Sequence, residues 1–510
     1  MQFIELVFGS FAMLFQLETL AYVVAGFLIG TLFSAIPGLT ATLALALLLP
    51  LTYSLDVSTA LMACASIYMA GMCGGSITAT TINIPGAPSS MMTALDGYPM
   101  QQRGEGAQAL GHASLGSMLG GSLGALLLIL LAPFIAKLSL LVQTTGKFSL
   151  LAFAMIVIVI AQRGNMIKAG MAACVGLMLA TIGLDAMVPV TRFTFGLADL
   201  TAGIDLMPMI IGTFAISELM IQAGSLSDSR LVNNALSKVK AIRRRDFIPS
   251  LASVRKIGIG CYLKSSLIGY AVGTLPGAGG SMGSFLAYVE TVRTSREPDS
   301  FGKGNPQGIA ASESANNAVC GGALVPMLTF GIPGDPITAI VLGVLVINGI
   351  QPGPQLMSEQ AGLIAPMLAS LLFSALILIP FTMFLLGPWF IRIVAIRKDL
   401  LYGTIALLAV VGSYVATYSG FQMVMTLAIG VLAYYLRKHN FPVVTLLLGF
   451  ILGPNLEEFL RRSLSLSNGN PLTFFTNLDS LFFVLLTALF VYFLVIRKPL
   501  KNPIAVAAKT

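Results

Sequence analysis

The sequence predicts an all-α polytopic membrane protein, and three observations support this. First, 56% of the 510 residues are hydrophobic and only 10% are charged, whereas soluble domains carry about 25% charged residues. Second, long apolar runs recur along the whole chain, and a membrane span needs about 20 such residues. Third, these runs are continuous, whereas the strands of a membrane β-barrel alternate over about 10 residues.

The clearest candidate spans are spread over both halves of the chain. They are 20–36, 115–136, 148–161, 166–184, 257–275, 361–386, 400–418, 421–436 and 481–496. The first 17 residues contain Glu5 and lack a basic segment. They therefore predict an amphipathic or embedded helix and not a cleaved signal peptide.

Charge and cysteine content narrow the function classes. Residues 224–256 carry eight Lys or Arg against two Asp, which gives +6 of the net +8. Between two spans, this charge indicates a cytoplasmic loop more readily than a nucleic-acid site. The five cysteines all lie in apolar segments, as expected for packed free thiols. With two histidines and no HExxH, we expect no transition-metal site and no cofactor.

Two blocks of sequence occur twice, in the same order. "GTLFSAIPGL" (30–39) matches "GYAVGTLPGA" (269–278), and "CGGSITATTINIPGAP" (73–88) matches "CGGALVPMLTFGIPGDP" (320–336). The sequence therefore predicts an internal duplication. We divide the chain into a first transmembrane half (1–223), the basic loop (224–256), a second transmembrane repeat (257–455) and a C-terminal loop with a last helix (456–510).

Each half contains a PGxP break within an apolar segment, at 85–88 and 333–336. Proline and glycine interrupt a helix there, and the freed backbone groups cannot face lipid. Broken segments at matching places in two halves point to a transporter's binding site. The alternative is an ordinary proline kink or a short loop at the membrane surface.

The polar residues around the breaks are mostly neutral, and neither break contains Lys or Arg. An anion would therefore rely on helix N-termini, and carbonyl oxygens at opposite termini could hold a cation. The predicted substrate-binding residues are Gly38, Thr40, Ser76, Thr81, Asn83, Gly86, Ser89, Gly279, Gly280, Ser281, Asn316, Asn317 and Gly334. The predicted cation-binding residues are Asn83, Asn317, Thr329, Asp335 and Glu313.

The two acidic candidates also have simpler interpretations. An ionisable residue near membrane depth is a candidate functional residue. Glu313 in "ASESANNA" could instead cap or face a helix N-terminus near water, and Asp335 in "PGDP" could be a turn residue. Asp96 and Asp185 are interpreted as interface or turn residues, and Tyr68 as a core residue.

Several stretches resemble the large membrane subunit of the tripartite tricarboxylate transporters. They include "GGSITATTINIPGAPSSMMTALDGYPM" (74–100), "GTLPGAGGSMGSFLAYVE" (273–290) and "ASESANNAVCGGALVPMLTFGIPGDPITAIVLG" (311–343). The resemblance implies about twelve spans, two inverted repeats with helical hairpins, and elevator-type movement. It also implies secondary uptake of citrate-like di- and tricarboxylates across the bacterial inner membrane, driven by Na⁺ or H⁺. The implied partners are a small four-span membrane subunit and a periplasmic binding protein.

Two other function classes were considered. A gradient-independent channel or pore could also use broken helices and carbonyl-lined sites, although no repeated filter or charged ring is visible. A membrane enzyme would need a nucleophile and a base within reach of each other. Both histidines lie outside the breaks, so we do not expect an enzyme.

Overall fold

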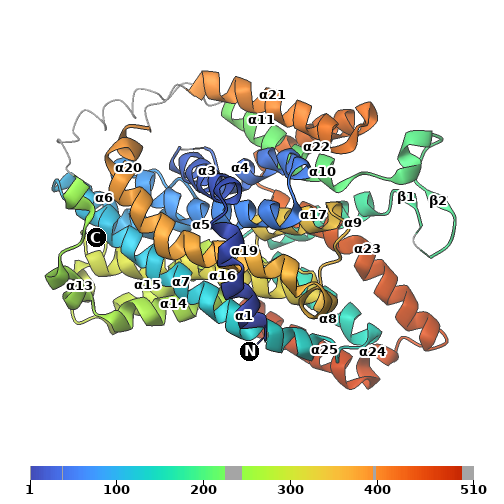
Figure 1. The fold of residues 1–510 in the computed structure, drawn as a ribbon. Coiled ribbons are helices and arrows are strands. Elements are labelled where there is room, and N and C mark those ends of the chain that lie inside the picture. Colours follow the sequence, from blue (N-terminus) through green and yellow to red (C-terminus); the bar gives the residue numbers. More distant parts are fainter. Residues whose placement is uncertain are drawn as a thin grey trace. The chain divides into compact units, whose positions relative to one another are not determined.

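The computed structural model describes residues 2–36, 38–162, 164–185, 187–223, 244–393 and 398–496. This part of the chain is predominantly helical, with one short β-hairpin formed by β1 (Gly183–Leu184) and β2 (Thr191–Arg192) (Figure 1). Eight described helices are long and apolar enough to cross a membrane, and six shorter apolar helices accompany them. The all-α polytopic fold is therefore confirmed, whereas the count of about twelve spans stays a prediction.

The chain forms two compact units, and each contains segments from both ends of the sequence. Unit 1 combines Met1–Ser139 with Ile204–His439, and unit 2 combines Leu140–Gly203 with Asn440–Thr510. This division by packing differs from our division by sequence repeats, which stays a prediction. Pro37 and most of the predicted basic loop lie outside the described residues.

Unit 1 holds all of the predicted site residues. Its elements before the basic loop are α1 (Gln2–Gly9), α2 (Phe11–Leu14), α3 (Leu17–Ala35), α4 (Ala41–Leu48), η1 (Leu49–Ser54), α5 (Val57–Ile82), η2 (Pro88–Ser90), α6 (Met91–Gln102), α7 (Gly106–Ser139), α10 (Leu206–Ile210), η4 (Ile211–Ile216) and α11 (Ser217–Ala223). Those after it are η5 (Arg244–Phe247), α13 (Leu251–Ile257), α14 (Ile259–Gly273), α15 (Gly279–Thr294), η6 (Pro298–Ser300), α16 (Pro306–Phe330), α17 (Pro336–Ile347), α18 (Pro354–Glu359), α19 (Ala361–Phe373), η7 (Ser374–Leu378), α20 (Ile379–Ile393), α21 (Lys398–Thr417) and α22 (Gly420–Lys438).

Two helix pairs in unit 1 repeat the same packing. Helix α3 packs on α5 in the first half and α14 packs on α16 in the second, each pair in backbone contact through glycine. A Cβ atom on Gly30 would lie 2.7 Å from Ile67 O, and one on Gly273 would lie 2.8 Å from Val319 O. Such small residues allow helix backbones to approach closely in membranes. Both broken segments therefore follow helices of matching arrangement.

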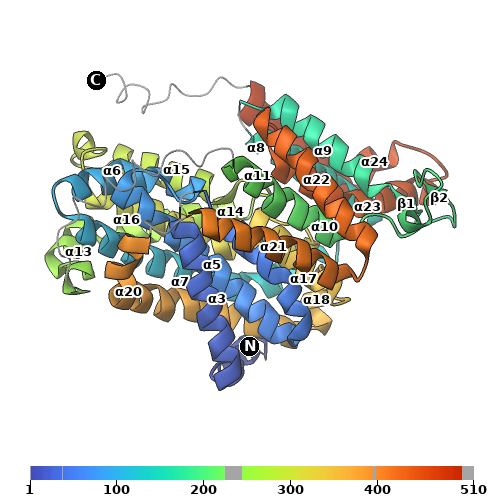
Figure 2. The same ribbon diagram turned by 90° about the horizontal axis from the view of Figure 1, so that it is seen from above.

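Contacts between the halves run in opposite order along α5 and α16. Asn316 Nδ2 donates to Met72 O at 2.8 Å, whereas Tyr68, one turn earlier in α5, bonds to Asp335 beyond the end of α16. Helices also cross over between the halves, because α7 packs on α16 and α19 packs on α5 (Figures 1 and 2). This arrangement agrees with inverted repeats, while elevator-type movement stays a prediction.

Unit 2 comprises four longer helices and some short elements among its described residues. They are α8 (Thr144–Ala161), α9 (Met166–Ala180), β1, β2, η3 (Ala198–Ala202), α23 (Val443–Leu466), α24 (Thr473–Thr476), α25 (Leu478–Val491) and η8 (Tyr492–Ile496). Helix α23 packs on α8 and α9, and α25 packs on α8. The predicted span 166–184 is wrong at its end, because the chain leaves the helix after Ala180 and enters the β-hairpin.

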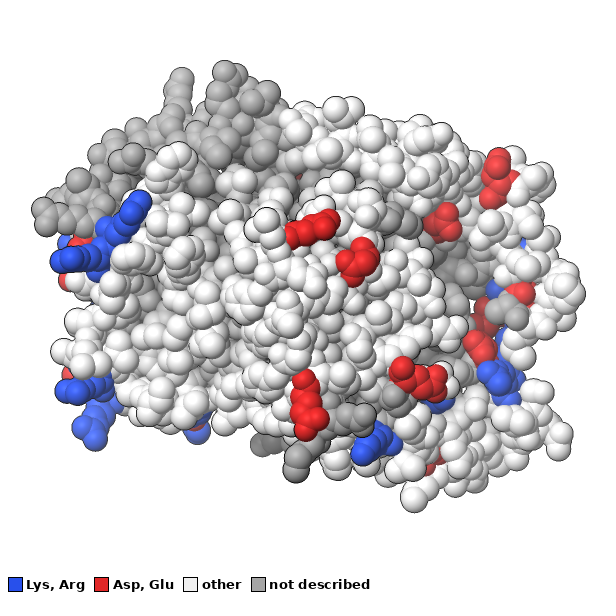
Figure 3. Space-filling model, in the orientation of Figure 1, with Lys and Arg blue, Asp and Glu red and all other residues white. Residues whose placement is uncertain are grey.

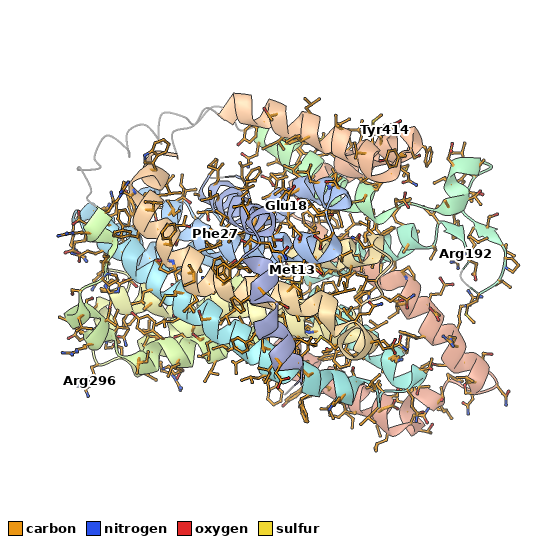
Figure 4. The ribbon with its side chains drawn as sticks, in the orientation of Figure 1. Met13, Glu18, Phe27, Arg192, Arg296 and Tyr414 are labelled. Carbon is orange, nitrogen blue, oxygen red and sulfur yellow. The ribbon has the colours of Figure 1, made fainter. Side chains whose placement is uncertain are left out.

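An ion-pair network holds the β-hairpin of unit 2. Arg192, labelled in Figure 4, contacts Asp185 at 3.2 Å and Glu457 at 2.6 Å, and Arg461 contacts the same two carboxylates at 2.7 and 3.0 Å. The Met187 amide and the Arg461 side chain donate to Asp185 and lower its pKa to about 2. Asp185 thus holds the turn of the hairpin, which agrees with the turn alternative of its predicted role.

The surface and the cysteines fit a chain that faces lipid. Most of the face shown in Figure 3 is uncharged. Four cysteines, Cys64, Cys73, Cys261 and Cys320, are buried free thiols, whereas Cys174 on α9 is exposed. The expectation that all five are packed inside is therefore wrong for Cys174.

Candidate functional site

The first PGxP break turns the chain back along α5. Helix α5 ends at Ile82, and Asn83 follows in the left-handed region with φ 57°. The Gly86 amide then donates to Gly75 O at 3.4 Å, and a Cβ on Gly75 would lie 2.5 Å from Ser90 Oγ. Helix α6 therefore begins about two turns back from the end of α5, inside the unit.

The second break repeats this turn along α16. Helix α16 ends at Phe330, and Gly331 follows with φ 70°. The chain then returns until a Cβ on Gly334 would lie 2.6 Å from Ala323 Cα. Gly334 O accepts a 2.8 Å hydrogen bond from the Gly277 amide, so this break is joined to the Pro–Gly turn between α14 and α15.

The turn between α14 and α15 connects the two breaks. While Gly277 bonds to Gly334 in the second break, Gly280 adjoins Ser89 in the first. A Cβ on Gly280 would lie 3.0 Å from Ser89 Cβ and 2.5 Å from Asn316 Oδ1. Only glycine fits at this close approach. The α14–α15 turn thus contacts residues at both breaks inside unit 1, while a direct meeting of the two breaks stays a prediction.

Helices α4, α6, α15 and α17 each begin at a Pro–Gly turn. They differ in whether a side chain caps the N-terminus. Thr40 Oγ1 accepts from the Leu43 amide at 3.1 Å and caps α4, and Asp335 caps α17. Within the described part of the chain, no side chain caps α6 or α15. The two uncapped N-termini are the ones that meet at Ser89 and Gly280. Because helix N-termini carry partial positive charge and free amides, this pair favours an anion.

Asp335 has the structural role that the turn interpretation gives it. Its Oδ1 accepts from the Thr338 amide at 2.8 Å, and the Asp335 amide donates to Thr338 Oγ1 at 2.9 Å, which together form a capping box. Its Oδ2 accepts a hydrogen bond from the Tyr68 hydroxyl on α5. Tyr68 is buried, as predicted, but sequence reasoning missed this bond. A cation-binding role for Asp335 stays a prediction.

Glu313 lies within α16, so the alternative that it caps this helix is wrong. Asn305 is the N-cap, and its Oδ1 accepts from the Gln307 amide at 2.9 Å. The Glu313 side chain is fully buried. Its Oε1 accepts from Thr93 Oγ1 at 2.5 Å, and its Oε2 accepts from Ser117 Oγ at 3.0 Å. Helices α6, α7 and α16 therefore enclose this carboxylate.

The structure brings some predicted residues to the Ser89–Gly280 contact or to Glu313 and places others elsewhere. Asn317 lies beside Glu313, because its Nδ2 donates to Ser117 Oγ at 2.7 Å and to Glu313 O at 3.1 Å. Asn83 and Ser281 are exposed. The hydroxyls of three residues donate at 2.7 Å to carbonyls of their own helices; they are Ser76, Thr81 and Thr329.

Glycine candidates shape the turns. Gly38 and Gly279 adopt positive φ values of 91° and 59°, and Gly38 O accepts from Gln222 Nε2 at 3.2 Å. Gly86 lies against the backbone of Ser34, where a Cβ would collide. These glycines position the chain and bring no side chain to the site.

Sequence reasoning missed the hydroxyl partners of Glu313 and the role of Asp96. Ser117 lies in the glycine-rich run of α7, a pattern that indicates close helix packing and could have identified it. Asp96 is buried on α6 and accepts from Tyr288 Oη at 2.8 Å and from the Gly304 and Asn305 amides at 3.0 and 2.8 Å. It ties α6 to the start of α16, which extends the predicted interface role.

Long apolar helices, together with paired broken helices that contact the same turn inside one unit, are typical of an α-helical membrane transport protein. Residues 20–448 match the family described as "Tripartite tricarboxylate transporter TctA family", and the chain belongs to that family. It is 35% identical over 457 residues to an uncharacterized 52.8 kDa protein in the TAR-I ttuC' 3' region of Agrobacterium vitis, covering 89% of this chain and 88% of that protein. It is also 36% identical over 209 residues to an uncharacterized protein in the TAR-II ttuC' 3' region of the same organism, covering 41% of this chain and 86% of that protein. No solved structure matches the chain.

Proposed function

We propose that this chain is the large membrane subunit of a secondary transporter that takes up a citrate-like di- or tricarboxylate across the bacterial inner membrane. A cation gradient drives uptake. A periplasmic binding protein delivers the substrate, and a small four-span membrane subunit completes the complex. Membership of a transporter family supports transport over catalysis. The observation that carries the substrate class is the meeting of two uncapped helix N-termini at Ser89 and Gly280.

The chemistry of this place suits reversible binding of a carboxylate. Neither break contains Lys or Arg, so amides and hydroxyls would hold the anion. A helix N-terminus contributes about 0.3–1 kcal/mol, and up to about 2 kcal/mol when partly buried. Two such termini attract an anion without binding it as tightly as a fixed charge would. A transporter needs this balance, because it must release its substrate on the other side.

Two buried side-chain atoms next to the N-termini have no hydrogen-bond partner in the described part of the chain. They are Ser90 Oγ and Asn316 Oδ1. Buried polar groups usually have a partner, which supports a ligand here. The Ser90 hydroxyl would donate to a carboxylate, and Asn316 Oδ1 would accept from the hydroxyl group of a citrate-like substrate.

Reconstitution tests the proposal. Proteoliposomes would contain this chain and the small subunit, with the binding protein present and an imposed Na⁺ or H⁺ gradient. We expect gradient-dependent uptake of labelled citrate or another member of a di- and tricarboxylate panel. Ser90→Ala should raise the substrate concentration for half-maximal uptake, while Ser54→Ala, on the exposed end of η1, should not. No uptake of any carboxylate under either gradient would refute the proposal.

A channel is the second candidate, and the same vesicles distinguish it. A transporter loses net accumulation when the gradient is dissipated. A channel continues to equilibrate the anion and produces single-channel currents in a planar bilayer. Currents of this kind would replace our proposal with the channel.

A further inference from the structure

Of the buried acids in unit 1, Glu313 has the weakest set of neighbouring groups to offset the loss of water around an ionised carboxylate. The hydrogen bonds recorded for its carboxylate come from side chains, the hydroxyls of Thr93 and Ser117 and the amide of Asn316. It lies two turns inside α16, away from the helix N-terminus. No Lys, Arg or His forms an ion pair with it in the described ranges. An ionised carboxylate in this setting is destabilised by the loss of water.

The other buried acids of unit 1 differ from Glu313 in this respect. Asp335 and Asp96 each accept hydrogen bonds from backbone amides, Asp335 at a helix N-terminus and Asp96 at the loop before α16. Glu218 forms an ion pair with Arg437. These amides and this ion pair offset part of the cost of burying the three carboxylates. The Glu313 carboxylate instead needs a proton or a cation for part of the transport cycle.

The packing around Glu313 favours a proton. A Cβ on Gly116 would lie 3.1 Å from Ala310 O and 3.3 Å from Glu313 Cβ, so α7 and α16 are already in close contact here. A sodium ion needs a surrounding shell of oxygen ligands, whereas a proton occupies one O–H bond. The 2.5 Å separation of Thr93 Oγ1 and Glu313 Oε1 is typical of a hydrogen bond to an ionised carboxylate, the form that would take up the proton.

We propose that Glu313 carries the proton whose gradient drives uptake. This inference rests on the proposed function. In the outward-facing state, a proton from water forms an O–H bond on the carboxylate. In the inward-facing state, that bond breaks and the proton leaves to water. The carboxylate keeps the electron pair, so charge and atoms balance.

Two helices, α6 and α16, connect Glu313 to the proposed substrate site at the N-termini of α6 and α15. Its partner Thr93 is three residues after Ser90 on α6, and Asn316 is three residues after Glu313 on α16. An ionised Glu313 would repel an anionic substrate one turn away, and its protonation removes that repulsion. Proton and substrate would therefore bind together.

Several other titratable groups lie on the helices packed against α16, among them Tyr98 on α6, Lys137 on α7 and Glu359 on α18. Cys73 on α5 faces Glu313 and Ser117. On α7, His112 Nε2 is paired with Ser253 Oγ, and on α14, Lys264 contacts Thr294 and Glu290. The remaining groups are Tyr68 on α5, Asp96 and Arg103 on α6, Arg255 and Lys256 on α13, Cys261, Tyr262 and Tyr270 on α14, Tyr288, Glu290 and Arg293 on α15, and Cys320 and Asp335 at α16 and α17.

Glu313→Gln in the reconstituted complex tests the proposal, because glutamine mimics the protonated side chain. With an inward proton gradient and no sodium, the wild type should accumulate labelled citrate or the panel member that it transports. Glu313→Gln should lose at least about tenfold in gradient-driven accumulation but retain exchange of external for internal substrate. Glu290→Gln on α15, a partly exposed acid paired with Arg293, is the matched control and should accumulate normally.

A milder variant keeps the test valid if Glu313→Gln fails to fold. Ser117→Ala removes one donor to the ionised carboxylate and should move the midpoint of the pH dependence of uptake to higher pH. Ser122→Ala on the same helix removes a hydroxyl that has no partner, and should not. Infrared spectra of the purified complex give a readout without substrate, since a pH-dependent protonated-carboxyl band should be absent in Glu313→Gln.

The outcomes separate the two proposals. Accumulation by Glu313→Gln equal to wild type, or wild-type uptake that follows a sodium gradient alone, would overturn the proton assignment and leave the transport function standing. If the wild type transports no carboxylate under either gradient, the proposed function itself fails. A carboxyl band that persists in Glu313→Gln would also remove Glu313 as the proton carrier.

Discussion

Removing the Tyr68 hydroxyl should destabilise the second break by a predictable amount. In the wild type, Asp335 Oδ2 is buried and accepts from Tyr68, while Oδ1 is occupied by Thr338. Tyr68→Phe keeps the ring and leaves Oδ2 with no donor at that position. A hydrogen bond to a charged group contributes about 1.5–3 kcal/mol, and an unsatisfied buried acceptor costs a similar amount. We therefore expect the free energy of unfolding to fall by about 2 kcal/mol.

The buried cysteines provide the assay for this change. Cys64, Cys73, Cys261 and Cys320 are buried thiols that react with a maleimide dye only when unit 1 opens. Thermal and denaturant unfolding in detergent can thus be followed by thiol labelling. Tyr270→Phe is the matched control, because the Tyr270 hydroxyl is buried without a partner and its removal should be neutral. Equal losses of stability in the two variants would refute the assigned Tyr68–Asp335 bond.

Three further predictions concern backbone and charge. Gly334→Ala should cost about 1–3 kcal/mol by overpacking and impair uptake, since its Cβ would lie 2.6 Å from Ala323 Cα, whereas Gly362→Ala meets nothing within 4 Å and should be tolerated. Asn83→Ala should destabilise the end of α5 by about 1 kcal/mol, because alanine is strained at φ 57°; if Asn83→Gly also abolishes uptake while stability is kept, Asn83 is a ligand and not only a cap. The pKa of Asp185 is depressed from 3.8 to about 2, so its stabilising effect is complete above pH 4 and is lost as pH falls towards 2. Asp185→Asn at neutral pH should therefore speed hydrogen exchange in residues 183–192, and unchanged exchange, or the same increase in Asp199→Asn, would contradict this.

The breaks were predictable because their causes are local. Proline and glycine interrupt a helix wherever they occur, and the repeated order of two blocks showed that the interruptions belong together. The left-handed turn after each helix was also visible in retrospect. Asn83 and Gly331 are separated by 248 residues, the same offset as Pro85 and Pro333, and asparagine and glycine are the residues that tolerate this conformation. We interpreted Asn83 as a ligand because it is polar, and the comparison with Gly331 would have identified it as a helix end.

The partners of the buried acids could not be predicted in this way. Tyr68 and Asp335 are 267 residues apart, and Thr93 and Glu313 are 220 residues apart. In both pairs one partner comes from each half, so the contact depends on how α5, α6 and α16 cross. Hydrophobic periodicity does not determine that crossing. A tyrosine or threonine in an apolar helix has many possible neighbours, and only the packed structure selects one.

The differences between the two halves determine where an anion could bind. Ala87 in the first break aligns with Asp335 in the second, and Ser90 aligns with Thr338, both at the offset of 248 residues. In the second half, Asp335 and Thr338 close the N-terminus of α17 with a capping box, and the negative charge there repels an anion. In the first half, Ala87 supplies no carboxylate, and α6 begins without a side-chain cap beside the equally uncapped α15. A symmetric duplication would offer two equivalent anion sites. Divergence at the capping positions, Thr40 against Gly279 and Asp335 against Ala87, would remove one of them, and a subunit with one remaining site would carry its substrate through one defined place.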